Sequence, residues 1–176
     1  MKKILFLFTL SISISVICQE QTPIKNVSSN WRVGGGLGLG FGNNSYFAFA
    51  ISPFAGYEIL PQLETGVTAG YQYSKWSDSR QNLFNVGPYV NYYPIPAIFL
   101  RSHYEFYTGT NKYEYGFNDE SYSYNFNESA LWLGGGYRST GRIQFFAGMM
   151  YNVLYKKETS LFSSGFRPIV GVSVGL

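Results

Sequence analysis

The feature that most constrains this chain is a two-residue alternation, in which large apolar side chains are separated by small or polar ones. Between Phe166 and Leu176, every second residue from Pro168 onwards is apolar, and most of the residues between them are small. Successive side chains of a β-strand point to opposite faces, so the alternation predicts strands with one broad apolar face. No stretch with the 3.6-residue period of an amphipathic helix competes with it.

The alternation recurs in segments that extend to the last residue. We expect eight strands, at about 31–42, 46–59, 64–75, 83–93, 98–108, 123–138, 141–155 and 166–176. Each segment supplies the roughly 9–11 residues that a tilted strand needs to cross a bilayer.

Side-chain volume decides which face of each strand points outward. Charged residues make up 13% of the 176 residues and aromatic residues 19%, so little charge is present to cover a water-facing surface. The apolar faces are broad and aromatic, whereas the opposite faces carry Gly, Ser, Ala, Asn and isolated charges. Large residues outside and small or polar residues inside are typical of a barrel in lipid. The sequence therefore predicts an all-β fold, an eight-stranded antiparallel up-and-down transmembrane β-barrel.

The first 30 residues differ in composition from the rest. A positive start, Met1-Lys2-Lys3, and an apolar run from Ile4 to Leu10 predict a signal peptide over 1–18. The polar stretch 19–30 is expected to be a short periplasmic lead-in, followed by the barrel domain over 31–176. Cys18 could instead be a lipidated first residue, although lipoprotein signals have a small residue where this chain has Ile17.

The connections between the expected strands differ in length. Three are short turns, at 60–63, 94–97 and 139–140. The other four lie at 43–45, 76–82, 109–122 and 156–165, and three of these are long and polar. Outer-membrane barrels have short periplasmic turns and longer outer loops. We therefore expect the cell outer membrane as the location, with both mature termini in the periplasm.

Aromatic residues near strand ends predict two girdles at the membrane interfaces. The expected inner girdle contains Tyr57, Tyr92, Phe99 and Tyr137, and the outer one Tyr73, Phe84, Phe106, Tyr155 and Phe166.

Signal peptide, eight alternating segments and asymmetric connections together resemble the small outer-membrane β-barrel families, similar to OmpX, the transmembrane domain of OmpA and other porin-family β-barrel domains. The resemblance covers about Trp31 to Leu176 and is architectural. Members often end in an aromatic residue that assists recognition by the assembly machinery, whereas this chain ends in Val174-Gly175-Leu176. The resemblance implies a structural or surface-interaction role, with outer-membrane lipid and the outer-membrane assembly machinery as partners.

Charged residues on the small faces are expected to fill the lumen. These are Glu58, Glu64, Arg101 and Arg142 towards the periplasmic end, and His103, Glu105, Glu128 and Arg167 further up. Eight strands enclose a space that side chains can fill, so opposite charges should pair across it and form a polar plug. The alternative is a breakable gate, which would make the protein a small porin-like channel for ions or small solutes.

The third outer connection alternates tyrosines with polar groups, a composition suited to adaptable contacts. Its contact candidates for a surface partner are Tyr113, Tyr115, Phe117 and Tyr122. The alternative is a protruding hairpin without a partner.

Other classes of function find little support. The only histidine, His103, has Arg101 and Glu105 as neighbours on its face and no hydroxyl nucleophile, so we expect no catalytic site. Dispersed carboxylates supply no metal cluster, and the glycines at 34–40 lack the dinucleotide-binding register, so no cofactor is expected. Without Lys2 and Lys3, the 13 basic residues become 11 against 10 acidic ones, a net charge of +1 that predicts no nucleic-acid partner. A remote alternative is a soluble periplasmic ligand-binding barrel, with its apolar faces inward.

Overall fold

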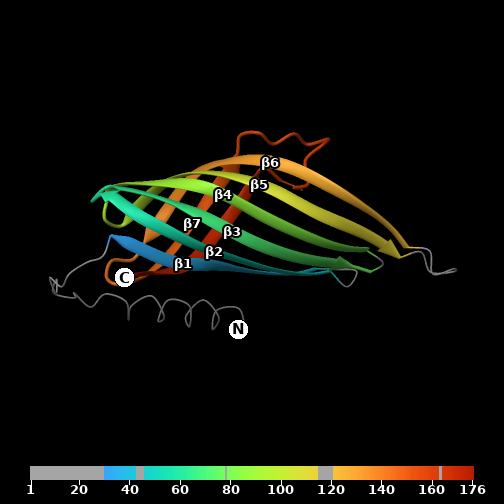
Figure 1. Ribbon diagram of the computed structural model, residues 1–176, viewed down its shortest axis with the longest axis horizontal. Coiled ribbons are helices and arrows are strands. Elements are labelled where there is room, and N and C mark those ends of the chain that lie inside the picture. Colours follow the sequence, from blue (N-terminus) through green and yellow to red (C-terminus); the bar gives the residue numbers. More distant parts are fainter. Residues whose placement is uncertain (1–29, 43–45, 78, 115–120, 163) are drawn as a thin grey trace, which may run out of the picture.

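The computed structural model shows a closed barrel in which eight antiparallel strands pair in sequence order and β8 returns to β1 (Figure 1). The structure describes residues 30–42, 46–77, 79–114, 121–162 and 164–176. The expected signal peptide and all but the last residue of the lead-in lie outside these ranges. The strands are β1 (Trp31–Phe41), β2 (Phe47–Leu60), β3 (Leu63–Trp76), β4 (Ser79–Ile95), β5 (Ile98–Glu114), β6 (Ser121–Arg138), β7 (Ile143–Asn152) and β8 (Phe166–Gly175). The predicted fold class is confirmed. No helix within the described ranges is long and apolar enough to cross a membrane.

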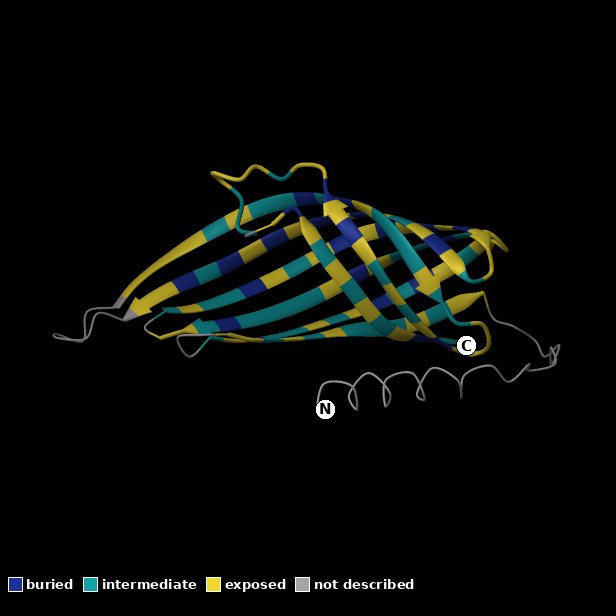
Figure 2. Cartoon of the chain, turned by 180° about the vertical axis from the view of Figure 1, so that it is seen from behind, coloured by how far each residue is buried: buried dark blue, intermediate teal, exposed yellow. Residues whose placement is uncertain are grey.

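Most large apolar side chains point outward, whereas the interior of the barrel holds polar side chains together with several aromatic rings. Leu37 and Phe41 are 71% and 75% exposed, whereas Glu64 and Trp132 are 1% and 0% exposed. Exposed and buried residues therefore alternate along the strands (Figure 2). This direction is the predicted one and is opposite to that of a soluble barrel with an apolar interior. Two ends are distinguished below: the turn end carries the β2–β3, β4–β5 and β6–β7 connections, and the loop end carries the others.

Two strands are longer than predicted at the loop end. β4 begins at Ser79 instead of 83, and β5 continues to Glu114 instead of 108. Trp76 pairs with Ser79, so the expected long connection over 76–82 is wrong, because most of these residues belong to β3 and β4. The prediction followed apolar residues, and it failed here because these strand ends carry polar side chains on their outward face.

β7 is shorter than predicted and ends at Asn152 instead of 155. The side-chain Oδ1 of Asn152 accepts hydrogen bonds from the N–H groups of Leu131, at 3.2 Å, and Leu154, at 3.0 Å. A side chain thus takes over the acceptor role that the next ladder position would have had, and the chain turns away.

One residue of the predicted inner girdle is misplaced. Phe99 is only 2% exposed and points into the lumen, because its neighbour Ile98 pairs with the outward-facing Tyr137. Tyr155 lies beyond the end of β7, in the β7–β8 connection.

The β1–β8 seam is the shortest ladder in the wall. It joins Arg32–Gly36 to Gly171–Gly175, and no register pair joins the described residues beyond Gly36 to β8. The Leu176 N–H donates to the Trp31 carbonyl and the Gly175 N–H donates to Arg142, so even-numbered residues of β8 point their backbone groups towards β1. Pro168 is one of them and has no N–H, which removes a donor where the ladder would have to continue.

Glycine allows close approach where aromatic rings lie in the lumen. A Cβ atom at Gly66 would lie 2.3 Å from the carbonyl oxygen of Ala55 and 2.7 Å from the ring of Tyr89. The absence of a side chain at this position therefore makes room for the Tyr89 ring.

We predict that Gly66→Ala destabilises the barrel and that Gly38→Ala is tolerated. The Ala55 carbonyl belongs to the β2–β3 ladder and cannot move freely, whereas a Cβ atom at position 38 has only the Ala50 Cβ, at 3.3 Å, within 4 Å. Overpacking of this kind costs roughly 1–3 kcal/mol. Urea unfolding of the detergent-solubilised barrel, followed by tryptophan fluorescence, measures the difference. Equal unfolding midpoints for the two variants would contradict the prediction.

Candidate functional site

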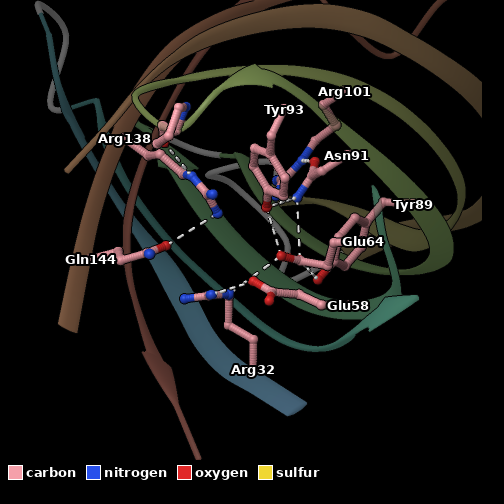
Figure 3. A network of polar contacts seen from close by, with 10 residues as sticks. Arg32, Glu58, Glu64, Tyr89, Asn91, Tyr93, Arg101, Arg138 and Gln144 are labelled. Carbon is pink, nitrogen blue, oxygen red and sulfur yellow. Dashed lines mark hydrogen bonds and ion pairs between the residues drawn. The ribbon is translucent and has the colours of Figure 1, made fainter. Parts of the chain in front are cut away.

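A buried carboxylate, Glu64 on β3, organises the lumen near the turn end (Figure 3). Its oxygens accept hydrogen bonds from the hydroxyl groups of Tyr89 and Tyr93, both at 2.6 Å, and from the side-chain amide of Asn91 at 3.2 Å. The Nε of Arg32 lies 3.4 Å away and its Nη2 contacts Glu58. A buried charge is tolerated when its hydrogen-bonding capacity is filled in this way. We call these residues the Glu64 network.

Arg101 on β5 lies beside this network among aromatic rings. Its Nε donates to the side-chain oxygen of Asn91 at 2.7 Å. Its guanidinium carbon lies between 4.7 and 5.9 Å from four ring centroids. The rings belong to Phe54, Tyr89, Phe99 and Phe146. Cation–π attraction therefore replaces much of the hydration that Arg101 loses.

A second network surrounds Glu105 in the middle of the lumen. Glu105 accepts hydrogen bonds from the Asn85 amide at 2.7 Å and from the Tyr107 hydroxyl, and forms a 2.7 Å ion pair with Arg167. Arg167 also donates to the Tyr107 hydroxyl at 2.7 Å, and its guanidinium carbon lies 4.1 Å from the ring centroid of Trp132. We call this the Glu105 network.

The β7–β8 connection contacts lumen residues beside the Glu105 network. Glu128 accepts hydrogen bonds from the hydroxyl of Ser160 and the N–H of Leu161, both at 2.6 Å. The ring of Phe162 lies edge-on to Tyr107 and Trp132, with centroid distances of 5.0 and 5.2 Å. Glu128 thus holds an apolar cap over the lumen.

The structure brings most of the predicted lumen residues together, but not in one group. Glu58, Glu64 and Arg101 lie at the turn end; His103, Glu105 and Arg167 lie in the middle; and Glu128 binds the β7–β8 connection. The expectation for Arg142 is wrong. Arg142 is exposed in the β6–β7 turn, and its Nε donates to the carbonyl of Gly175. It lies outside the strand because β7 begins at Ile143, the residue after it.

Sequence reasoning missed several members of the Glu64 network. They are Arg32, Tyr89, Asn91 and Tyr93. It also missed Arg138, whose guanidinium carbon lies 3.4 Å from the ring centroid of Tyr93. The signal was present in the alternation. Arg32 is an even-numbered residue of β1, as are Gly34, Gly36, Gly38 and Gly40 on its inward face. Tyr89, Asn91 and Tyr93 are odd-numbered residues of β4, as is the inward-facing Gly87.

The loop end carries a tyrosine-rich hairpin, formed by residues 107–114 of β5 and 121–130 of β6, which we call the outer hairpin. Tyr113 pairs with Tyr122, and its ring stacks on Tyr124 with a centroid distance of 6.2 Å. The contact candidates Tyr115 and Phe117 lie outside the described residues.

One edge of the outer hairpin is open. β7 pairs only with Trp132–Arg138, so within the described ranges no strand pairs with the outer edge of 121–130. The N–H of Val153 donates to the carbonyl of Leu131, which shows that odd-numbered residues of β6 direct their backbone groups towards this side.

The lumen does not contain a catalytic arrangement built on His103. Its Nε2 lies 2.8 Å from the Thr68 hydroxyl, but Glu105 lies nearest to that same nitrogen, at 3.6 Å, and Nδ1 faces Arg167 at 3.5 Å. A triad needs the carboxylate on the nitrogen opposite the nucleophile. Among the described residues, no three His, Cys, Asp or Glu side chains form a group that could hold a metal ion.

Comparisons with known proteins give likeness in fold. No protein-family model and no curated protein matches the sequence. The chain is similar to Ail, the attachment invasion locus protein of Yersinia pestis, with a TM-score of 0.53 and 13% identity over 83% of this chain and 96% of that one. The N-terminal β-barrel domain of Pseudomonas aeruginosa OprF gives a TM-score of 0.46 and 16% identity over 85% and 99%. Neisserial surface protein A gives 0.46 and 17% over 86% and 100%. The likeness to Ail shows that the chain shares the fold of a known small β-barrel.

We predict that Glu64→Ala is strongly destabilising and that Glu58→Ala is much less so. Removing the Glu64 carboxylate leaves Arg32, Tyr89 and Tyr93 without their buried acceptor, and breaking a buried ion pair in this way costs roughly 3–5 kcal/mol. The side chain of Glu58 is 29% exposed, so water can replace part of what is lost. Urea unfolding in detergent micelles compares the two. A larger loss for Glu58→Ala would contradict the assignment of Glu64 as the centre.

Proposed function

We propose that this protein is an integral outer-membrane β-barrel with a closed lumen, and that its outer hairpin binds an extended segment of another protein at the cell surface. The open edge of β6 carries this proposal. The turn end and both ends of the barrel domain would then face the periplasm.

The exterior supports a location in lipid. On β5 the outward residues from Ile98 to Phe106 include Leu100 and Tyr104, and these four side chains are between 36% and 51% exposed. This stretch approaches the roughly 9–11 residues that a tilted strand needs to cross a bilayer. Beyond Phe106 the outward face of the outer hairpin carries threonine, lysine, serine and asparagine, as expected for a segment above the membrane.

The outer hairpin supports the binding role because it combines an unpaired edge with aromatic surface. An exposed strand edge offers a row of N–H and C=O groups to an incoming strand. Beside this edge, the rings of Tyr122, Tyr124 and Phe126 follow one another at centroid distances of 6.3 and 6.2 Å. Tyrosines give large contact area with few side-chain rotations to restrict. Backbone pairing would supply affinity, and the aromatic rings would supply specificity.

The contents of the lumen favour a plug over a pore. The Glu64 network, the Glu105 network and the ring of Phe162 follow one another along the barrel axis. Each of the two networks is built from side chains of several strands. Their ion pairs and hydrogen bonds would have to break before a hydrated ion could pass.

We predict that the purified protein produces no stable conductance steps in a planar lipid bilayer. The reason is that the ion pairs and hydrogen bonds of the two networks would have to break before a hydrated ion could pass. Single-channel recording at moderate voltage is the measurement, with a general porin as the positive control. Reproducible steps in the unmodified protein would favour the porin-like channel instead.

The binding role is tested by photo-crosslinking on intact cells. A photoreactive amino acid replaces Tyr122, which is 66% exposed beside the open edge. We predict a crosslinked protein partner that is retained in Asn125→Ala and lost in Asn125→Pro. Asn125 is an odd-numbered residue of β6, so its backbone N–H points to the open edge. Alanine keeps this donor, whereas proline removes it.

Both variants must first show the heat-modifiable gel mobility of an intact barrel. Proline is tolerated on an edge strand whose N–H faces solvent, so folding should survive. An equal crosslink in Asn125→Ala and Asn125→Pro, or no crosslink in the parent protein, would contradict binding by strand addition.

A further inference from the structure

The Glu64 network borders a small cavity at the turn end of the lumen. Three arginines line it, each from a different strand: Arg32 of β1, Arg101 of β5 and Arg138 of β6. Figure 3 shows their guanidinium groups around Glu64. Among the residues that the structure describes, Glu64 is the only carboxylate that lines the cavity.

The positive charge of this lining is incompletely compensated. Glu64 and Glu58 both contact Arg32. Within the described part of the chain, no carboxylate lies within 4 Å of Arg101 or Arg138. Both cations lie against aromatic rings and donate only to neutral oxygens, those of Asn91 for Arg101 and of Pro96 and Gln144 for Arg138. Rings attract a cation but do not neutralise it, and an uncompensated charge in a lumen of low dielectric is costly.

Hydrogen-bond donors are also in excess at the cavity. Arg32 Nη1 is buried and has no hydrogen-bond partner among the described residues. Its side chain is only 12% exposed. For Arg101, the described hydrogen bond uses Nε. The donors therefore lack an acceptor of negative charge, which is the chemistry of an anion site.

We propose that this cavity binds a small monovalent inorganic anion of the kind of chloride, held by Arg32, Arg101 and Arg138. Three guanidinium groups against the carboxylates of Glu64 and Glu58 leave one positive charge, which suits one negative charge, and Glu64 disfavours a multiply charged anion by repulsion. Donors that converge from three strands suit a spherical ion better than a planar carboxylate, which prefers one bidentate fork.

The site has a route to solvent. Glu58 and Arg138, which border the turn end, are both partly exposed, so an ion can enter from that side without crossing the Glu105 network. This proposal does not depend on the surface role of the outer hairpin.

The test measures thermal unfolding of the refolded full-length barrel in detergent micelles, in sodium chloride and in sodium gluconate at equal ionic strength. An anion that binds only the folded state raises the unfolding midpoint as its concentration rises. We expect the midpoint to rise with chloride but not with the bulky gluconate. Arg138→Gln should lose most of this chloride-dependent shift.

Two further variants separate a built site from general charge effects. Arg142→Gln removes the same charge from the same end of the barrel but does not line the cavity, so it should keep the full chloride shift. Glu58→Gln frees the Arg32 guanidinium from its carboxylate and should enlarge the shift. A larger chloride-dependent shift in this variant cannot result from a loss of stability.

Crystals of the unmodified protein grown in sodium bromide give a direct readout that does not depend on any variant. An anomalous peak among the three guanidinium groups supports the proposal. The proposal is overturned by equal midpoints in chloride and gluconate, by an equal loss of the shift in Arg142→Gln, or by a bromide map without a peak in the cavity. A larger stabilisation by inorganic phosphate than by chloride would overturn the assignment to a small monovalent anion.

Discussion

Backbone hydrogen bonding around a closed ring is the constraint on which this structure depends. In the proposed location in lipid, strand edges that face the apolar exterior would have no water to bind, and only closure would satisfy them. Closure rests on the seam between Arg32–Gly36 and Gly171–Gly175, which is shorter than the ladders on either side of it. Pro168 limits that seam. At the loop end, the wall therefore keeps open edges on β1 and β6 among the described residues.

A narrow barrel also determines how charge is held inside. Because eight strands enclose little more than the volume of their own side chains, each buried charge must find its partners on neighbouring or facing strands. Glu64 and Glu105 do so through tyrosine hydroxyls and arginines, and Arg101 does so through rings and one amide. The two networks support the proposed plug, while the excess of arginine at the turn end supports the proposed anion site.

The ends of the strands are where prediction from apolar residues fails. The alternation located all eight strands and the direction of their faces, because successive side chains of a strand point to opposite faces and large apolar residues recur at every second position. It missed the first residues of β4 and the last of β5, where the outward side chains are polar. At these ends, backbone hydrogen bonds pair the strands although the outward side chains are polar. Backbone hydrogen bonds do not depend on the type of side chain, so the sequence pattern does not reveal them.

The sequence by itself determined the fold class and which residues point inward, since both follow from a local period of two. Only the tertiary structure decided which inward residues meet. Arg32 from the first strand reaches Glu64 on the third, and Glu128 binds a loop instead of an arginine, whereas Arg142 stays at the rim. Such pairings depend on strand stagger and on closure between the first and last strands, which bring together residues far apart in the chain.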